Sequence, residues 1–217
     1  MPAAALKVWG RRNSLNVQKV MWIIGELELE HEHINVGGAF GGLDTPEFLA
    51  RNPHGKIPVI EHDGVVVWES QAILRYLGAT FGEGSLWSAD PAQRAVADSW
   101  LDWSQTTLQP AFIDLFFGFY RTPEAQRDAG RIERATQQCA RLYGLLDQQL
   151  AQRPYLGGDT LTLADFGAGT TVFRYLTMGA ERPPLPNVEH WLERLSQSPA
   201  YREHVMMPFG DMFGKLP

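Results

Sequence analysis

The sequence contains a single cysteine, Cys139, among its 217 residues. One cysteine cannot form an internal disulfide, and the C-x-x-C motif of dithiol redox enzymes is absent. The chain therefore needs no oxidising compartment, and we expect it to work in the cytoplasm.

Positive charge is scarce as well. The 19 lysines and arginines face 25 aspartates and glutamates, which gives a formal net charge of −6. Such a surface is poorly suited to neutralising many phosphates, so we expect no nucleic-acid partner. The sequence also lacks a run of about 18 apolar residues and a basic, then apolar, leader, so we expect neither a membrane span nor a signal peptide.

The residues that are present are typical of a globular protein. Hydrophobic residues make up 44% of the chain, charged residues 20% and aromatic residues 11%. At roughly 100 to 200 residues per domain, the length allows one large domain or two small ones.

The N-terminal third alternates strand-like and helix-like patterns. Two runs with apolar residues at helical spacing read as helices, 17–27 and 69–77. Asp63-Gly64 is a hairpin turn signal between the last two of the strand-like runs. We expect these elements to form an α/β domain with a mixed four-stranded sheet. The four strand-like runs are 6–9, 31–36, 57–60 and 65–68.

The rest of the chain reads as all-α. Pro91 follows a capping residue and begins a helix, which Pro110 should end or kink. Cys139 falls on the apolar stripe of a later helix and is expected to be a small buried hydrophobe. Glycines cluster just before Pro91, so we place a linker there. The expected domains are residues 1–82 and 90–217.

Three motifs occur along the chain. Residues 52–60 read N-P-H-G-K-I-P-V-I, residues 68–77 read W-E-S-Q-A-I-L-R-Y-L, and residues 162–165 read T-L-A-D. In this order and spacing they resemble motifs of the cytosolic glutathione S-transferases, in particular Ser- or Asn-type bacterial members that are theta- or nu-like. The resemblance spans about residues 5 to 205. It implies a thioredoxin-like domain, a helical-bundle domain, a homodimer and a glutathione site at the domain junction.

The first two motifs suit the binding of glutathione as a co-substrate. Pro58 begins a strand, and a cis bond from Ile57 would turn the Ile57 backbone outward to pair with the cysteinyl unit. Ser70 lies at a helix N-terminus, which would hold the γ-glutamyl carboxylate, and Glu69 would take the ammonium group. Structural interpretations stay open: Pro58 as protection of a sheet edge, and Ser70 as a helix cap.

Positive charge is expected around this site because glutathione is anionic. Lys56 is the candidate for the glycyl carboxylate, and Arg12 is a further candidate contact. Arg11 and Lys19 lie in neighbouring segments and add to the positive field. Lys56 has an alternative interpretation as an ordinary solvated side chain.

Conjugation requires the glutathione thiolate, because a thiol is a poor nucleophile. A thiol pKa of about 8.5 leaves about 3% ionised at pH 7, and lowering it by roughly two units requires about 3 kcal/mol. The resemblance places the sulfur ligand between the first strand and the first helix. Ser14 is our first candidate for this donor, with Asn16 as substitute or helper. The alternative is that Ser14 only caps the helix.

The acceptor substrate is expected across the cleft, against aromatic residues of the helical half that core packing explains equally well. No cysteine lies near Ser14, so a mixed disulfide with the protein is not expected. His31 and His33 have no third ligand nearby, so we expect no metal site. The candidate aromatic residues are Trp103, Phe112, Phe116 and Tyr120.

The leading hypothesis is therefore a glutathione transferase that activates the thiolate for attack on a hydrophobic electrophile. One alternative is a glutathione-dependent peroxidase or disulfide reductase without a protein cysteine. Another is a non-catalytic binding protein that keeps the glutathione-binding fold.

Overall fold

The computed structural model describes residues 6–216, and its N-terminal part is built on a four-stranded sheet. The strand order is β2-β1-β3-β4, with β1 parallel to β2 and the other two pairings antiparallel. The predicted mixed four-stranded sheet is confirmed. The strands are β1 Leu6–Trp9, β2 His31–Ile34, β3 Val59–His62 and β4 Val65–Trp68.

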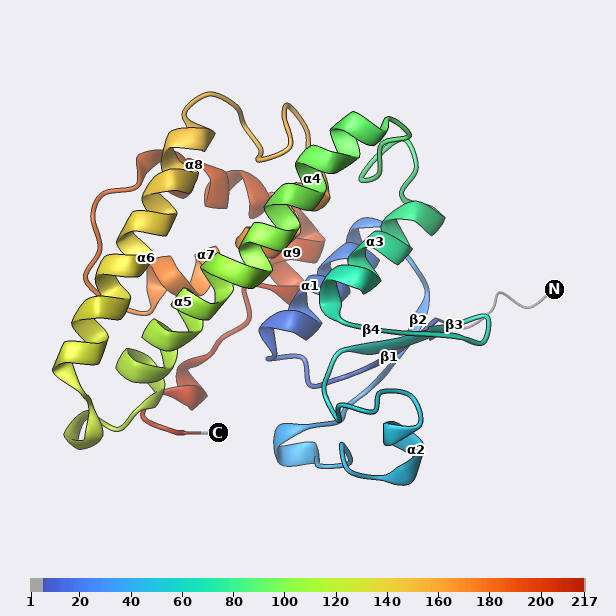
Figure 1. Cartoon of the computed structure of the whole chain (residues 1–217), viewed down its shortest axis with the longest axis horizontal. Helices are drawn as coiled ribbons and strands as arrows, with labels where there is room; N and C mark the ends of the chain where they lie inside the picture. The colour runs from blue at the N-terminus through green and yellow to red at the C-terminus, as the bar shows by residue number, and fades with distance from the viewer. Residues whose placement is uncertain (1–5, 217) are drawn as a thin grey trace.

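Two longer helices lie on one side of this sheet and a short one on the other (Figure 1). Helix α1, Leu15–Glu26, and helix α3, Ser70–Phe81, pack against each other. Both bury an apolar face, as their helical spacing of hydrophobic residues predicts. Helix α2, Pro46–Leu49, follows a short 3-10 turn, η1 Gly38–Phe40.

The remaining described chain is helical, as predicted. One long helical path is broken at a π-helical turn, η2 Ser104–Leu108, before it continues as α5. The sequence places the irregularity at Pro110, whereas the wide turn comes just ahead of it, where proline supplies no N–H to the preceding turn. The helices are α4 Pro91–Trp103, α5 Gln109–Leu115, α6 Ala129–Leu150, α7 Leu163–Thr177, α8 Pro186–Leu195 and α9 Pro199–His204, with short turns η3 Phe116–Arg121, η4 Glu124–Gln126 and η5 Gly210–Met212.

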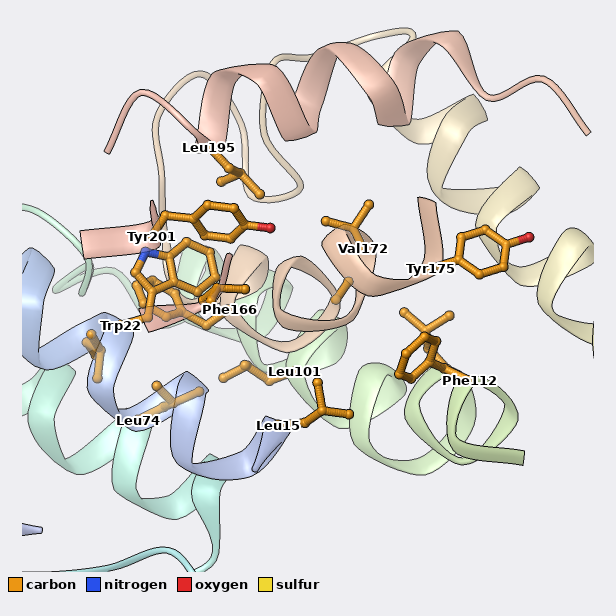
Figure 2. Packing of buried hydrophobic residues seen from close by; sticks show 14 of the residues in the cluster. Leu15, Trp22, Leu74, Leu101, Phe112, Phe166, Val172, Tyr175, Leu195 and Tyr201 are labelled. Atoms are coloured by element: carbon orange, nitrogen blue, oxygen red, sulfur yellow. The ribbon is translucent and has the colours of Figure 1, made fainter. Parts of the chain in front are cut away.

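One hydrophobic core runs through both parts of the molecule (Figure 2). Trp22 of α1 is fully buried, and its ring centroid lies 4.1 Å from that of Phe166 in α7 and 4.8 Å from that of Tyr201 in α9. Cys139 is fully buried, and burial raises the pKa of its thiol to about 12, which confirms its packing role. Within residues 6–216, no helix is both long and apolar enough to cross a bilayer.

The segment between α3 and α4 contains the predicted linker. A domain boundary is defined by independent folding, so the division into residues 1–82 and 90–217 stays a prediction.

Candidate active site

Three segments meet at one end of the sheet because of the strand register. Trp9 of β1 pairs with Val59 of β3, and Val59 pairs with Trp68 of β4. The chain leaves β1 and β4 at this end and enters β3 there, so the flanking segments lie side by side. These segments are 10–14, 57–58 and 69–70.

The segment that enters β3 carries a cis peptide bond between Ile57 and Pro58, as predicted. Its loop is held from within by the buried Asn52. The Nδ2 of Asn52 donates to the Lys56 carbonyl at 2.8 Å, and its Oδ1 accepts from the His54 N–H at 3.0 Å. Lys56 itself is exposed, and its contact with a glycyl carboxylate stays a prediction.

Helix α3 begins at Ser70, directly after β4. Glu69, with φ +70°, is the N-cap residue, and its carbonyl accepts the first helical bond from the Ile73 N–H at 2.9 Å. The interpretation of Ser70 as the cap is therefore wrong, because the helix starts one residue earlier than that role requires. The Ser70 hydroxyl is buried and has no hydrogen-bond partner among the described residues. A hydroxyl of this kind at a helix N-terminus is suited to donate to an anion.

The loop before α1 is fixed by the helical part of the molecule. The Nη2 of Arg174 in α7 donates to the Asn13 carbonyl at 2.9 Å and to Gln18 Oε1 at 3.3 Å. Ser14 occupies the N-cap position of α1, but its hydroxyl makes no capping hydrogen bond. The hydroxyl is therefore available for another partner, contrary to the interpretation of Ser14 as a cap alone.

A buried lysine lies one helical turn after Asn16. The Nζ of Lys19 donates to Asn16 Oδ1 at 3.0 Å, to Gln105 Oε1 at 3.0 Å and to Gln109 Oε1 at 2.5 Å. The Nε2 of Gln109 donates to the same Asn16 oxygen at 3.0 Å. Two donors thus occupy the Asn16 oxygen, so its orientation is fixed and its NH₂ group is left to face elsewhere.

The ionisation of Lys19 is tuned by its surroundings. The side chain is fully buried, and burial lowers the pKa of Lys19 to about 7, while the nearby charge of Glu69 raises it. The three carboxamide oxygens match the three N–H bonds of an ammonium group. A positive charge is therefore available beside Asn16 close to neutral pH.

A cavity of about 160 Å³ opens beside Ser14 and Asn16. It lies where α1 meets α5 and η3, so both parts of the molecule line it. Its other lining residues include Gln109, Ile113, Phe116, Phe117, Met212 and three arginines, Arg11, Arg121 and Arg174.

The structure separates the four aromatic residues predicted for the acceptor. Phe116 lines the cavity, whereas Phe112 is fully buried and stacks on Phe116 at 5.6 Å. Trp103 lines a different hollow, between α4 and α6, and Tyr120 packs on Phe209. The helical repeat alone does not show which face of an aromatic segment is covered, so these four residues could not be told apart in the sequence.

Arg12 and the histidines of β2 form a local cluster. Arg12 is exposed, lies 3.9 Å from Glu203 and donates its Nε to His33 Nδ1 at 3.4 Å. His33 Nε2 contacts the Gly10 carbonyl at 2.8 Å, so this histidine holds the loop. No group of three metal-ligating side chains occurs among residues 6–216. A contact of Arg12 with glutathione stays a prediction.

Several residues in or beside this cavity could not be assigned to the site from the sequence. Lys19 is expected only as part of a positive field, and Gln109, Arg121 and Arg174 carry no motif. One signal was available: Lys19 interrupts an apolar helical face three residues after Asn16. A cation inside such a face requires a local polar partner.

The sequence of this chain is similar to those of known proteins. Residues 4–79 match the family model for the glutathione S-transferase N-terminal domain, and residues 129–194 match the model for its C-terminal domain. The chain is 38% identical over 205 residues to glutathione S-transferase GstB of Escherichia coli K12, covering 94% of this chain and 99% of GstB. It is 31% identical to the disulfide-bond oxidoreductase YfcG of the same organism, over 85% of this chain and 87% of YfcG.

A solved structure shows the same fold. The theta class glutathione S-transferase of Xanthomonas axonopodis pv. citri, with glutathione bound, matches with a TM-score of 0.90 and 43% identity, covering 94% of this chain and 99% of that one. The sequence motifs, the family models and this structural match agree. The chain belongs to the glutathione S-transferase family and is a glutathione transferase.

Proposed function

We propose that the three segments at the sheet end hold glutathione, and that Ser14 and Asn16 together bind its sulfur as the thiolate. The observation that supports this proposal is the hydrogen bonding of the Ser14 and Asn16 side chains. The Ser14 hydroxyl makes no capping bond, and the Asn16 oxygen is already occupied by Lys19 and Gln109. One hydroxyl and one amide donor are thus left at a single cavity.

The rest of the tripeptide follows from the same geometry. The γ-glutamyl carboxylate meets the Ser70 hydroxyl and the start of α3, while Glu69 takes the ammonium group. The cysteinyl unit pairs with Ile57 beside the cis bond to Pro58. The glycyl end extends toward Lys56 and Arg12, whose side chains are both exposed. The cavity residue Phe116 then faces an apolar acceptor.

The donors supply the free energy that ionisation of the thiol needs. A hydrogen bond to a charged group contributes about 1.5 to 3 kcal/mol, so two donors cover the roughly 3 kcal/mol required for a two-unit shift. The positive charge of Lys19 behind Asn16 acts in the same direction. The N-terminus of α1, where Ser14 occupies the N-cap position, adds on the order of half a kcal/mol.

Replacement of the two donors tests this proposal. We expect Ser14→Ala and Asn16→Ala each to lower kcat/KM by about tenfold to a hundredfold and to raise the pH midpoint of the rate, because each removes one donor to the sulfur. The ultraviolet absorbance of bound thiolate, titrated with pH, gives the midpoint directly. An unchanged midpoint in one variant would remove that residue from the assignment, and unchanged midpoints in both would overturn the proposal.

We also propose that the chain forms a homodimer and works in the cytoplasm. Exposed apolar side chains on β4, α3 and α4 support an interface between two copies. The single, buried cysteine is consistent with a reducing compartment. The exposed apolar residues of this interface are Val65, Val66, Phe81 and Val96. Sedimentation equilibrium tests whether the chain forms a dimer.

The comparisons do not favour the alternative functions, which are a peroxidase, a disulfide reductase and a non-catalytic binding protein.

A further inference from the structure

Positive charge gathers on the cavity beside the proposed sulfur site. Arg11, Arg121 and Arg174 line it, and Arg11 and Arg121 also line an adjoining hollow of about 600 Å³ toward the C-terminal segment. Among residues 6–216, Asp211 is the sole acidic residue lining the two hollows. This concentration of positive charge stands out in a chain whose net charge is −6.

The most buried of the three arginines has no carboxylate partner. Arg174 is 3% exposed and donates only to a carbonyl and a carboxamide oxygen, while its Nε has no partner among the described residues. Burial, together with the charges of Arg11 and Arg121, lowers the pKa of Arg174 to about 10, while the charge of Asp211 opposes this shift. Buried like charges without a counter-ion are unfavourable, and an anion placed among them relieves the repulsion.

The other two arginines line the same cavity from different parts of the chain, Arg11 from the loop before α1 and Arg121 from η3. Arg11 is half-buried against Gly38, and its side chain forms neither an ion pair nor a hydrogen bond with the residues that the structure describes. Arg121 donates its Nε to the Lys215 carbonyl at 2.8 Å and lies over the Phe117 ring at 5.1 Å. Its stacking fixes the guanidinium without neutralising it.

Apolar walls complete the cavity. Ile113, Phe116 and Phe117 line it together with the arginines. We propose that this cavity selects acceptor substrates that combine an apolar body with a carboxylate, so that the enzyme conjugates glutathione to organic anions. The inference rests on the proposed glutathione site, since the acceptor carbon has to meet the sulfur held by Ser14 and Asn16. The carboxylates of glutathione itself are accounted for by Ser70 and Lys56.

A pair of matched acceptors tests the proposal. Chlorodinitrobenzoate and its neutral amide, chlorodinitrobenzamide, have nearly the same shape and react alike: the thiolate forms a C–S bond, the C–Cl bond breaks, and chloride leaves with the electron pair. Each kcat/KM is divided by the uncatalysed rate constant, and the ratio of the two quotients measures preference for the anion. We expect the wild-type enzyme to prefer the carboxylate by about tenfold or more, as for a charge-assisted contact.

Two variants assign that preference to the arginines. Arg11→Met and Arg121→Met should each reduce the ratio by about tenfold, because each removes one donor and one charge. Arg141→Met, on the exposed face of α6, is the matched control and should leave the ratio unchanged. Calorimetry with glutathione alone, on the same proteins, reports separately on the glutathione site.

The possible results distinguish failure of the organic-anion proposal from failure of the proposed glutathione site. A wild-type ratio near one would overturn the inference, and so would variants that lose glutathione affinity while the ratio stays constant, since the arginines would then serve glutathione. Failure of the wild-type protein to bind glutathione would overturn the proposed glutathione site instead. If both variants fail to fold, the wild-type protein decides: benzoate should compete with the neutral amide acceptor, and no competition would contradict the inference.

Discussion

At the scale of single residues, the unexpected feature is a fully buried lysine with no carboxylate in hydrogen-bond contact. Lys19 connects Asn16 of α1 to Gln105 and Gln109 at the π-helical turn of the other half. The motif residues Pro58, Glu69 and Ser70 could be singled out in the sequence as candidates because they match a fixed pattern, and their contacts with glutathione stay a prediction. The lysine could not be placed, because two of its three partners, Gln105 and Gln109, lie 86 and 90 residues away in the chain.

Lys19→Met tests whether the lysine acts on the sulfur through Asn16. Without the ammonium group, Asn16 loses one of the two donors that orient it, and the thiolate loses a nearby positive charge. We expect the pH midpoint of thiolate formation to rise by about one unit. Lys7→Met, at an exposed position on β1, serves as the control. A folded Lys19→Met protein with the wild-type midpoint would show that the lysine has only a packing role.

The same lysine should make stability depend on pH. Burial lowers the pKa of Lys19 from 10.5 to about 7, so between these values the unfolded chain holds a proton that the folded protein lacks. The free energy of unfolding due to this group therefore rises with pH across that window and falls as pH drops toward 7. Urea unfolding measures the free energy of unfolding of the wild-type protein and of Lys19→Met. The wild-type value minus the Lys19→Met value should rise with pH, with a slope of up to about 1.4 kcal/mol per pH unit. A difference that is constant with pH would contradict this.

At the scale of elements, the sequence predicts that a helix or strand exists better than it predicts the residues at which that element begins and ends. All four strands and both longer helices of the first part are found, but β2 ends at Ile34 and α3 continues to Phe81. Alternating and helical spacing report which faces are buried, whereas ends depend on hydrogen bonds that spacing does not encode. The π-helical turn is of this second kind, and it carries Gln105 to Lys19.

The contact between α7 and the π-helical turn η2 that follows α4 depends on a glycine. A Cβ added to Gly167 of α7 would lie 2.6 Å from the Ser104 Cβ at the start of η2, so Gly167→Ala forces α7 and η2 apart. We expect a loss of about 1 to 3 kcal/mol in the free energy of unfolding. Gly144→Ala on α6 is the matched control: nothing lies within 4 Å of its Cβ position, so alanine should add about 0.5 to 1 kcal/mol. Urea denaturation measures both, and equal effects of the two substitutions would contradict the packing argument.

At the scale of the whole molecule, composition and motif order predict two parts but not the way in which they share one core. Trp22 belongs to the sheet part, yet its burial is completed by Phe166 and Tyr201 of the helical part (Figure 2). The candidate active site has the same character, since Lys19 and the cavity beside Ser14 are each completed by residues beyond position 100. The contact between the two parts therefore both buries the core and forms the cavity of the proposed site.

This shared core predicts how the chain responds to being cut at the linker. A fragment of residues 1–82 would expose Trp22, which packs on Phe166 and Tyr201, and the face of α3 at Gly78, which lies against Leu163 and Trp87 in the whole chain. We expect the fragment to show no cooperative thermal transition, whereas the whole chain should unfold with coincident transitions in tryptophan fluorescence and far-ultraviolet circular dichroism. Mixing the fragment with residues 83–217 tests whether the contact alone restores order. A fragment that unfolds cooperatively by itself would show that the sheet part is an independent domain, and the predicted boundary would then describe folding as well as architecture.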